Sequence, residues 1–467
     1  MGTLHPHKPV VAVIGGGISG LSVAFWLLQH DTEVIVLEQT DRPGGLIKSY
    51  RSSGYLADYA ANCLLNYLPE VNKLCDEVGV GREKVYRSDA AKNRYLLLKD
   101  GHPSPLPRGL LQFVRTDLWS VRGKLRLLAE PLIRRDKSGD DETISHFIRR
   151  RFGKETLEHI VEPFVGGSYA GDPEQLSLKS TFPVLHALEQ QYRSLTAGAL
   201  IKRMRGSRAN CPMHLFSFRD GMETLPKAIS MYMGDRFSPD TRVVEIKVNG
   251  KHGYSIEAEN KGRHIIYNAD AVCIAAPAYD AAKLLCRIAP DVSGILVRVG
   301  YSPVAVVYTG FARDKVRHPL DGIGCMVPSK HGGFILGTLW NSSLFSNRAP
   351  DGMVAITNYL GGKRHPEALE RTNDELLDVT MNDLKKIIGI SGPPDYVHIV
   401  RHQRALPQFS LGHKDIAIKL DDLQNRMPGL FITGNYLSGI SVRDCISYGK
   451  RLAGRIAKGF SDERLFG

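Results

Sequence analysis

The chain has 467 residues, of which 43% are hydrophobic and 24% are charged, close to the averages for soluble globular proteins. This composition excludes a disordered chain, a coiled coil and a multi-span membrane protein, and the length predicts about three domain-sized units. A surplus of basic residues, 61 Lys and Arg against 49 Asp and Glu, gives a net charge of +12. The surface therefore favours an anionic partner, such as nucleic acid, anionic lipid or a substrate that carries carboxylates.

Seven cysteines are scattered along the chain without a Cys-x-x-Cys pair. An odd, dispersed set is typical of reduced thiols, so it predicts a cytoplasmic setting and no metal site. The seven are Cys63, Cys75, Cys211, Cys273, Cys286, Cys325 and Cys445.

Residues 10–29 carry no charge, a run long enough to suggest a membrane span or a signal sequence. Four glycines within residues 15–20 and the lack of a small-residue cleavage site argue against both. The run instead predicts a buried strand at Val10–Ile14, a glycine turn and a helix over about 21–30.

A second apolar strand is predicted over 33–38, and it ends in the acidic residue Glu38. Strand, glycine turn, helix, strand and terminal acid together are typical of a dinucleotide-binding fold, in which the glycines admit a pyrophosphate and the acid binds a ribose. A tight strand–helix turn without a ligand is the alternative. Further strands over 240–246, 269–277 and 429–433, with a helix over 441–458, predict a discontinuous nucleotide-binding fold with two insertions.

The stretch from Arg108 to Lys137 combines basic and large apolar residues. It holds eight Lys and Arg against three acids, a local charge of +5. Its apolar residues recur at roughly helical spacing, which is typical of a helix that lies on anionic lipid. A surface helix that packs on the core and exposes a solvated basic face explains the same pattern.

A second glycine pair, Gly44-Gly45, follows the predicted ribose acid. With it, residues 15–45 resemble the double-glycine motif of FAD enzymes such as amine oxidases, carotenoid desaturases and protoporphyrinogen oxidases. Four later blocks resemble the protoporphyrinogen oxidase family specifically. They are EPFVGGSYAGDP (162–173), RDGMETLP (219–226), LPQFSLGH (406–413) and GNYLSGISVRDCISYG (434–449).

The resemblance implies an α/β fold with a discontinuous Rossmann-like FAD-binding domain of the amine-oxidase type, a substrate-binding domain and a mainly helical membrane-binding insertion. The expected boundaries are FAD-binding parts at 1–88, 213–290 and 411–467, the helical insertion at 89–212 and the substrate-binding domain at 291–410.

The implied activity is the six-electron oxidation of protoporphyrinogen IX to protoporphyrin IX in heme biosynthesis, with dioxygen as acceptor and hydrogen peroxide as product. Since the flavin carries this chemistry, no catalytic side chain is expected, and His413 and Asp444 are interpreted as structural or cofactor-positioning groups.

The family also implies a site, residue by residue. The ADP half of FAD is expected at the first glycine motif and Glu38, the adenine near Val243, and the flavin at the start of the C-terminal helix, whose dipole stabilises negative charge on the reduced ring. Arg94 occupies the position of a propionate-binding arginine, and a guanidinium suits a carboxylate bidentately. The expected cofactor residues are Gly15, Gly16, Gly17, Ile18, Ser19, Gly20, Glu38, Gln39, Arg42, Gly45, Leu46, Val243, Gly434, Ile440, Ser441 and Val442. The expected substrate residues are Arg94, Gly167, Ile323, Met326 and Tyr359.

The chain departs from the family pattern in three places. Ala60 and Ala61 add side chains where the backbone commonly approaches the flavin, Ile323 replaces a pocket aromatic, and Lys414 stands where some members have a tryptophan.

Three other functions remain open at this point: a coproporphyrinogen III oxidase of the same family, an amine oxidase or polyene desaturase, and a flavin-bound scaffold or isomerase. Arg94 and the basic insertion favour protoporphyrinogen. We expect peripheral attachment to anionic lipid on the cytoplasmic face of the membrane, no nucleic-acid partner, and leave open a hand-over to a ferrochelatase and a homodimer.

Overall fold

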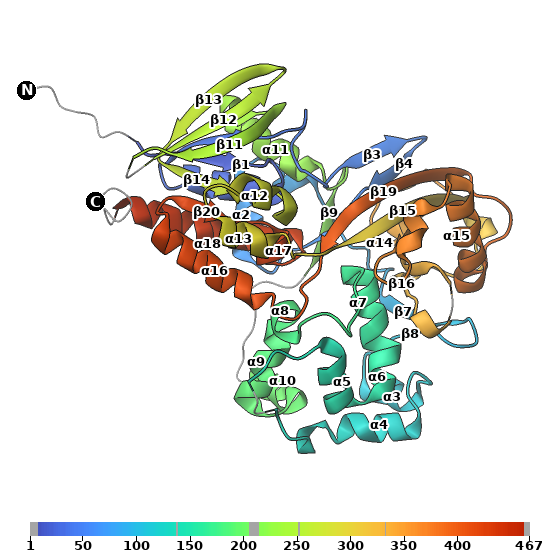
Figure 1. The fold of residues 1–467 in the computed structure, drawn as a ribbon. Coiled ribbons are helices and arrows are strands. Elements are labelled where there is room, and N and C mark those ends of the chain that lie inside the picture. The colour runs from blue at the N-terminus through green and yellow to red at the C-terminus, as the bar shows by residue number, and fades with distance from the viewer. Residues whose placement is uncertain (1–7, 137–138, 205–213, 251–252, 332, 462–467) are drawn as a thin grey trace, which may run out of the picture.

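The computed structural model describes residues 8–136, 139–204, 214–250, 253–331 and 333–461. A parallel sheet with its helices, a mixed and mainly antiparallel sheet, and a helical unit form three parts of the molecule, and the helical unit extends below the two sheets in Figure 1. Of the predicted cysteine thiols, Cys211 lies outside the described residues, and the other six are free.

The parallel sheet has five strands within the described residues, in the order β10-β2-β1-β14-β20. They are β1 (Val10–Ile14), β2 (Glu33–Leu37), β10 (Phe237–Ser238), β14 (Ala271–Ile274) and β20 (Leu430–Ile432). Alternate residues of β1 face two different cores, since Val11 and Val13 pack with the helices α1 and α18 while Ala12 and Ile14 pack on the other side. Four of the predicted strands, at 10–14, 33–38, 269–277 and 429–433, lie in this sheet, whereas the strand predicted at 240–246 belongs to a separate antiparallel sheet. The uncharged run 10–29 is a strand, a turn and a helix.

Elements from early and late in the described chain meet at this sheet. Helix α1 (Ile18–Leu28) follows β1, and helix α18 (Val442–Ser461) follows β20 and lies along α1 (Figure 1). The contact is close because a Cβ built on Gly449 of α18 would lie 2.8 Å from Cβ of Ser22. The predicted nucleotide-binding fold is therefore discontinuous along the chain, as predicted. The other side of the sheet is covered by β11 (Thr241–Val248), β12 (Tyr254–Asn260), β13 (Arg263–Ala269), α12 (Ala278–Leu285) and α13 (Pro290–Leu296).

The second large sheet has the order β19-β15-β18-β17-β16-β7-β8 in the described chain. Its strands are β7 (Asn93–Leu97), β8 (Pro103–Pro105), β15 (Tyr301–Ala312), β16 (Gly322–Met326), β17 (Ile335–Leu339), β18 (Met353–Gly361) and β19 (Tyr396–Pro407). Helix α15 (Asn373–Ile388) packs on one face. Strands β7 and β8 lie within residues 89–212, which the sequence analysis assigned to the helical insertion, so the sheet extends into that range.

Further strands and helices accompany the two sheets. They are the strands β3 (Ser49–Ser52), β4 (Tyr55–Asp58), β5 (Leu64–Leu65), β6 (Lys84–Tyr86) and β9 (Leu215–Phe218), and the helices α2 (Pro69–Glu77), α11 (Thr224–Met233), α14 (Asn341–Leu344), α16 (Lys414–Arg426) and α17 (Asn435–Ser438). The segment after β4, residues 59–63, contacts both parts, because Ala61 packs against the core beside the parallel sheet and Asn62 hydrogen-bonds Tyr359 of the second sheet.

The helical unit contains α3 (Leu110–Arg115), α4 (Val121–Leu128), α5 (Ile144–Phe152), α6 (Lys154–Thr156), α7 (Glu162–Tyr169), α8 (Leu178–Thr181), α9 (Pro183–Tyr192) and α10 (Leu195–Met204). The prediction of a single basic amphipathic helix from Arg108 is wrong, because two short helices and a 3-10 turn (Glu130–Leu132) form there instead. The second helix starts at Ser120, whose hydroxyl accepts from the backbone N–H of Gly123, and Pro131 ends the helical run.

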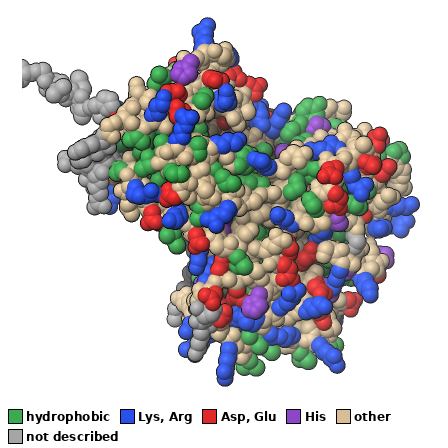
Figure 2. All heavy atoms as spheres, in the orientation of Figure 1, with side chains coloured by type: hydrophobic (Ala, Val, Ile, Leu, Met, Phe, Trp, Pro, Cys, Tyr) green, Lys and Arg blue, Asp and Glu red, His purple; other side chains and the backbone are tan. Residues whose placement is uncertain are grey.

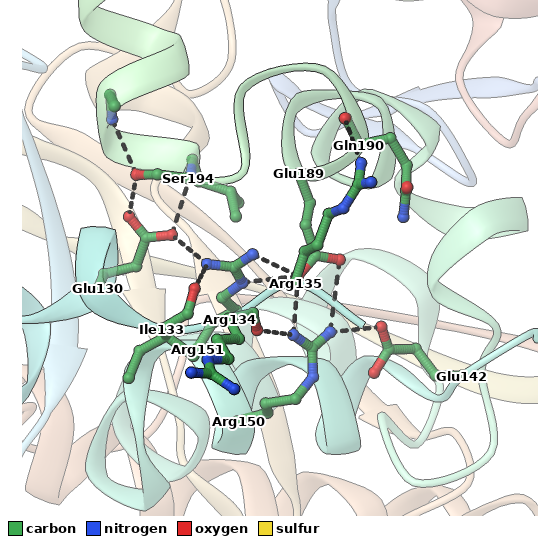
Figure 3. A network of polar contacts seen from close by, with 12 residues as sticks. Glu130, Ile133, Arg134, Arg135, Glu142, Arg150, Arg151, Glu189, Gln190 and Ser194 are labelled. Atoms are coloured by element: carbon green, nitrogen blue, oxygen red, sulfur yellow. Dashed lines mark hydrogen bonds and ion pairs between the residues drawn. The ribbon is translucent and has the colours of Figure 1, made fainter. Parts of the chain in front are cut away.

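Buried charges hold the helical unit together (Figure 3). The guanidinium of Arg151 contacts the carboxylates of Glu130 and Glu189, and all three side chains are at most 1% exposed. Glu189 also binds Arg150, which binds Glu142. Because Glu130 lies in the 3-10 turn after α4, this network anchors that turn to α5 and α9.

Among the described residues, no helix combines the length and the apolarity needed to cross a bilayer.

Candidate flavin and substrate site

The first glycine turn packs tightly on one side and is open on the other. A Cβ on Gly15, whose φ is +112°, would lie 2.8 Å from the carbonyl oxygen of Ala275, and a Cβ on Gly20 would lie 2.0 Å from the carbonyl oxygen of Gly15. A Cβ on Gly17 would have no described atom within 4 Å. Gly17 precedes α1, and no side chain caps this helix. The N-terminal N–H groups of α1 therefore face free space.

Glu38 lies at the end of β2 with a fixed carboxylate. Its Oε2 accepts from the backbone N–H of Gly16 at 2.6 Å, and its Oε1 accepts from the N–H and the hydroxyl of Thr40 at 2.9 and 2.7 Å. The side chain is 6% exposed. The carboxylate is thus held at the edge of the glycine turn, where a ribose would lie in a dinucleotide-binding fold.

The second glycine pair closes against the first. The N–H of Gly44 donates to the carbonyl of Gly16 at 2.8 Å. The Arg42 guanidinium donates to the carbonyl oxygens of Gly45 and Ile47, at 2.6 and 3.0 Å. Arg42 thereby shapes the loop through its backbone. A Cβ on Gly45 would meet only the Cα of Gly17, at 3.4 Å, so the two open glycines border the same space.

The start of α18 completes this side. The Ser441 hydroxyl accepts from the N–H of Asp444 at 3.1 Å and donates to its carboxylate at 2.5 Å, which caps the helix. Cys445, one turn into α18, packs in the same buried cluster as Ile18 and Leu21 of α1. The N-termini of α1 and α18 therefore lie together, and Ile440 and Val442 flank the cap.

The remaining predicted cofactor residues lie around this centre. Gln39 is exposed next to Glu38, and Leu46 is 45% exposed after Gly45. Val243 lies on β11, two residues after Thr241, whose N–H donates to the Glu38 carbonyl at 2.7 Å. Gly434 begins α17 with φ +158°.

These features fit FAD. Two helix N-termini and an open glycine loop supply N–H groups and positive dipole ends for a pyrophosphate. Glu38 supplies the acceptor for a ribose hydroxyl. Gly17 and Gly45 have no side chains, and the pyrophosphate of FAD fits into the space that they leave open.

One face of the second sheet brings four of the five predicted substrate residues together. Met326 pairs with Gly337, and Gly337 pairs with Tyr359, so the three lie in one row across β16, β17 and β18. Paired residues point to the same face. The missing side chain at Gly337 leaves a gap between the Met326 and Tyr359 side chains.

Arg94 and Gly167 border this row. Leu96 pairs with Met326, and Arg94, two residues earlier on β7, points to the same face. Helix α7 carries Gly167 over the sheet, where a Cβ would come 3.9 Å from the Leu336 carbonyl oxygen. A larger side chain at Gly167 would therefore enter the space above the row.

Arg94 lies near the 59–63 segment. Its charge opposes the burial that raises the pKa of the Cys63 thiol to about 12. Its side chain is exposed, and no described residue forms an ion pair or hydrogen bond with its guanidinium. Arg94 is thus a free cation beside the sheet row and the segment that approaches the FAD site.

Ile323 lies apart from the row. The register of β16 shifts between Gly322 and Cys325, and the Ile323 side chain packs with Ala91 and Phe345.

His413 and Asp444, interpreted as structural, are both engaged. Burial lowers the pKa of His413, and its Nε2 lies 2.7 Å from the carbonyl oxygen of Tyr436, which fixes the proton on that nitrogen. Asp444 pairs with Arg443 and Ser441.

Sequence reasoning missed a polar chain that joins the sheet to the 59–63 segment. Asn62 contacts Tyr359 and Asn341, and Asn341 contacts Thr357. In the sequence, this segment was noticed only because Ala60 and Ala61 depart from the family pattern. A single asparagine such as Asn62 has no periodic pattern that would predict its contacts.

Comparison with known proteins agrees with this geometry. The family model of flavin containing amine oxidoreductases matches residues 18–457. Protoporphyrinogen oxidase 2 of Arabidopsis thaliana is 31% identical over 95% of this chain and 92% of its own length. Coproporphyrinogen III oxidase of Bacillus subtilis (strain 168) is 29% identical, over 95% and 97%.

Solved structures share the fold. A crystal structure from Exiguobacterium sp. 255-15 has a TM-score of 0.79 at 22% identity and covers 97% of this chain and 99% of its own. Cyclohexylamine oxidase from Brevibacterium oxydans IH-35A has a TM-score of 0.70 at 15% identity, with 97% and 100% covered.

The fold and the glycine-lined site therefore define an FAD-dependent oxidoreductase. The chain belongs to the flavin-containing amine oxidoreductase family and, within it, to the group that includes the protoporphyrinogen and coproporphyrinogen III oxidases.

Proposed function

We propose that the chain oxidises protoporphyrinogen IX to protoporphyrin IX, with dioxygen as the acceptor. The free guanidinium of Arg94 beside the Met326–Gly337–Tyr359 row carries this proposal. A porphyrinogen is a broad apolar ring system with carboxylates at its edge, so it needs an apolar face with a cation at one side. The 31–32% identity to plant protoporphyrinogen oxidases supports the same substrate.

Different residues of this chain serve cofactor binding and substrate binding. Gly17, Gly45 and Glu38 would hold the ADP half of FAD, and the N-terminus of α18 would lie beside the flavin half. Bound FAD would supply the acceptor for a hydride from a substrate carbon and the route of the electrons to dioxygen, with hydrogen peroxide as the product. Arg94 binds a propionate, and the sheet row orients the ring system and excludes water.

We also propose that the helical unit binds the cytoplasmic face of an anionic membrane. Its side chains on α3, α4 and the following turn expose large apolar surface, between 61% and 83% of each residue. They are Leu110, Leu111, Val114, Val121, Leu125, Leu128 and Leu132. This set is the apolar tip.

Basic residues surround the apolar tip. Arg115, Arg122 and Arg134 are exposed, and green apolar and blue basic side chains mix along the lower edge of the molecule in Figure 2. Lys137 lies outside the described residues. Apolar side chains that enter lipid and cations that meet anionic headgroups support an interfacial attachment. Six free thiols among the described cysteines support a reducing compartment.

A hand-over of product to a ferrochelatase and a homodimer stay predictions.

The test mixes the purified flavoprotein anaerobically with protoporphyrinogen and, separately, with coproporphyrinogen, and records the flavin absorbance. Rapid bleaching by protoporphyrinogen, with little by coproporphyrinogen, supports the proposal. The reverse preference assigns coproporphyrinogen, whose two extra propionates need further cations. No bleaching by either compound contradicts a porphyrinogen oxidase.

A further inference from the structure

A polar chain runs from the second sheet to the segment beside the FAD site. The Thr357 hydroxyl donates to Oδ1 of Asn341 at 2.7 Å, and Nδ2 of Asn341 donates to Oδ1 of Asn62 at 2.8 Å. Nδ2 of Asn62 then donates to the Tyr359 oxygen at 2.7 Å. Thr357, Asn341 and Asn62 are each at most 6% exposed, so this chain is a fixed part of the structure.

The Ala60 carbonyl fixes which atom donates and which atom accepts in the hydrogen bonds of this polar chain. Nδ2 of Asn62 also lies 3.3 Å from the Ala60 carbonyl oxygen, which can only accept. The amide nitrogen of Asn62 must therefore face both Ala60 and Tyr359. The Tyr359 oxygen accepts, and its own proton has no acceptor among the described residues.

That proton stays on the oxygen. Burial raises the pKa of Tyr359 well above its usual value, and the Asn62 hydrogen bond opposes the rise only in part. Tyr359 is a neutral donor over the whole physiological pH range, on the sheet face that also carries Met326 and Arg94.

The hydrogen-bonding groups of the substrate determine what the Tyr359 hydroxyl can bind. A porphyrinogen carries four pyrrole N–H groups, which only donate. Each round of oxidation removes a hydride from a bridging carbon and one proton. Imine–enamine tautomerisation then redistributes the remaining protons, so that the fourth bridging carbon also loses one hydrogen and two nitrogens end with a free lone pair. Oxidised ring systems therefore contain imine nitrogens that accept a hydrogen bond.

We propose that the Tyr359 hydroxyl donates to an imine nitrogen of the oxidised ring system and so holds partly oxidised intermediates in the site between rounds. This inference rests on the proposed porphyrinogen substrate and adds a specificity for oxidation state. Asn62, Asn341 and Thr357 are positioning residues because they orient the hydroxyl without reaching the ring.

The test compares Tyr359→Phe with Tyr396→Phe. The control removes a hydroxyl from the same sheet, and the Tyr396 hydroxyl is buried without a partner among the described residues. Protoporphyrin IX binding is titrated by absorbance, and porphyrinogen binding by anaerobic competition against the porphyrin on enzyme whose flavin is already reduced. Flavin content and melting temperature of each variant report folding.

We expect Tyr359→Phe to weaken porphyrin binding about fivefold, the value of one hydrogen bond, with porphyrinogen binding unchanged and Tyr396→Phe at the wild-type level. Equal porphyrin affinity in wild type and Tyr359→Phe overturns the inference, as does an equal loss for both ligands. If wild-type flavin is not bleached by any porphyrinogen, the proposed function fails, whereas the porphyrin titration still decides the role of Tyr359.

Discussion

The Glu130 carboxylate and the Arg151 guanidinium lie 3.2 Å apart in the helical unit, and neither side chain reaches solvent. Glu130 also accepts from the N–H groups of Leu195 and Thr196 at 3.0 and 3.2 Å, and so caps α10. One carboxylate therefore joins the turn behind the apolar tip to two other helices.

Glu130→Ala leaves Arg151 charged and buried with one partner fewer. We expect the free energy of unfolding, measured in urea, to fall by about 3–5 kcal/mol. Glu259→Ala is the control, because its pair with Arg242 is half exposed, and it should cost less than about 1 kcal/mol. Similar losses in both variants would contradict the structural role of the buried network.

Gly17→Val should yield folded protein without flavin. A Cβ there meets no described atom, so the fold tolerates it, but it fills the space that a pyrophosphate needs. The measurement is the flavin-to-protein absorbance ratio beside a circular dichroism spectrum. Gly294→Val, at an equally open glycine of α13, should keep its flavin. A fully flavinylated Gly17→Val protein would show that the pyrophosphate lies elsewhere.

Arg94→Ala should raise KM for the porphyrinogen by about tenfold, since an ion pair to a carboxylate contributes on the order of 1.5–3 kcal/mol. Flavin content should stay normal. Lys92→Ala, an exposed neighbour, should leave KM unchanged, and Arg94→Lys should recover part of the loss because it keeps the charge without the fork. Wild-type KM in Arg94→Ala excludes this residue from substrate binding.

Attachment to lipid is measured by sedimentation with vesicles. Wild-type protein should sediment with vesicles that contain anionic lipid, and the bound fraction should fall as salt rises. Replacing Leu128 and Leu132 together with Asp should abolish binding, whereas Ile418→Asp, which changes an exposed apolar residue of α16, should not. Salt-independent binding, or none, would make the apolar tip an ordinary surface.

Acidification should destabilise the protein partly through His402. Its Nε2 lies 2.9 Å from the Tyr59 carbonyl oxygen, and burial lowers its pKa, although that carbonyl opposes the shift. Below about pH 6.5 the unfolded chain binds the proton and the folded chain does not, so the contribution of this neutral histidine is present above that pH and lost as pH falls. The melting temperature of wild type should therefore drop more between pH 7.5 and 5.5 than that of His402→Gln. Parallel curves would exclude His402.

Local sequence predicted the nucleotide-binding part well because its signals are short-range. The apolar run Val10–Ile14, the glycines that follow and Glu38 lie within thirty residues. The buried strand, the tight turn and the ribose site each require a particular residue type at these positions. The boundaries of β1 were predicted to the residue.

Long-range contacts could not be predicted in the same way. Asn62 and Tyr359 are 297 residues apart, and no pattern in either segment points to the other. Strand β8 has three residues, two of them prolines, so no alternation marked it as part of a sheet. The basic stretch suggested one helix because its apolar spacing continues across a break that Ser120 and Pro131 impose.

The pairing of Val272 with Leu430 and the contact of α1 with α18 have a consequence for biosynthesis. A chain emerging from the ribosome exposes the first glycine turn long before strand β20 and helix α18, which close the site, have been made. Cofactor loading therefore waits for β20 and α18, and the apolar face of α1 lacks its partner while the intervening residues are synthesised. Truncation near residue 425 should give a chain that chaperones retain and that never becomes yellow.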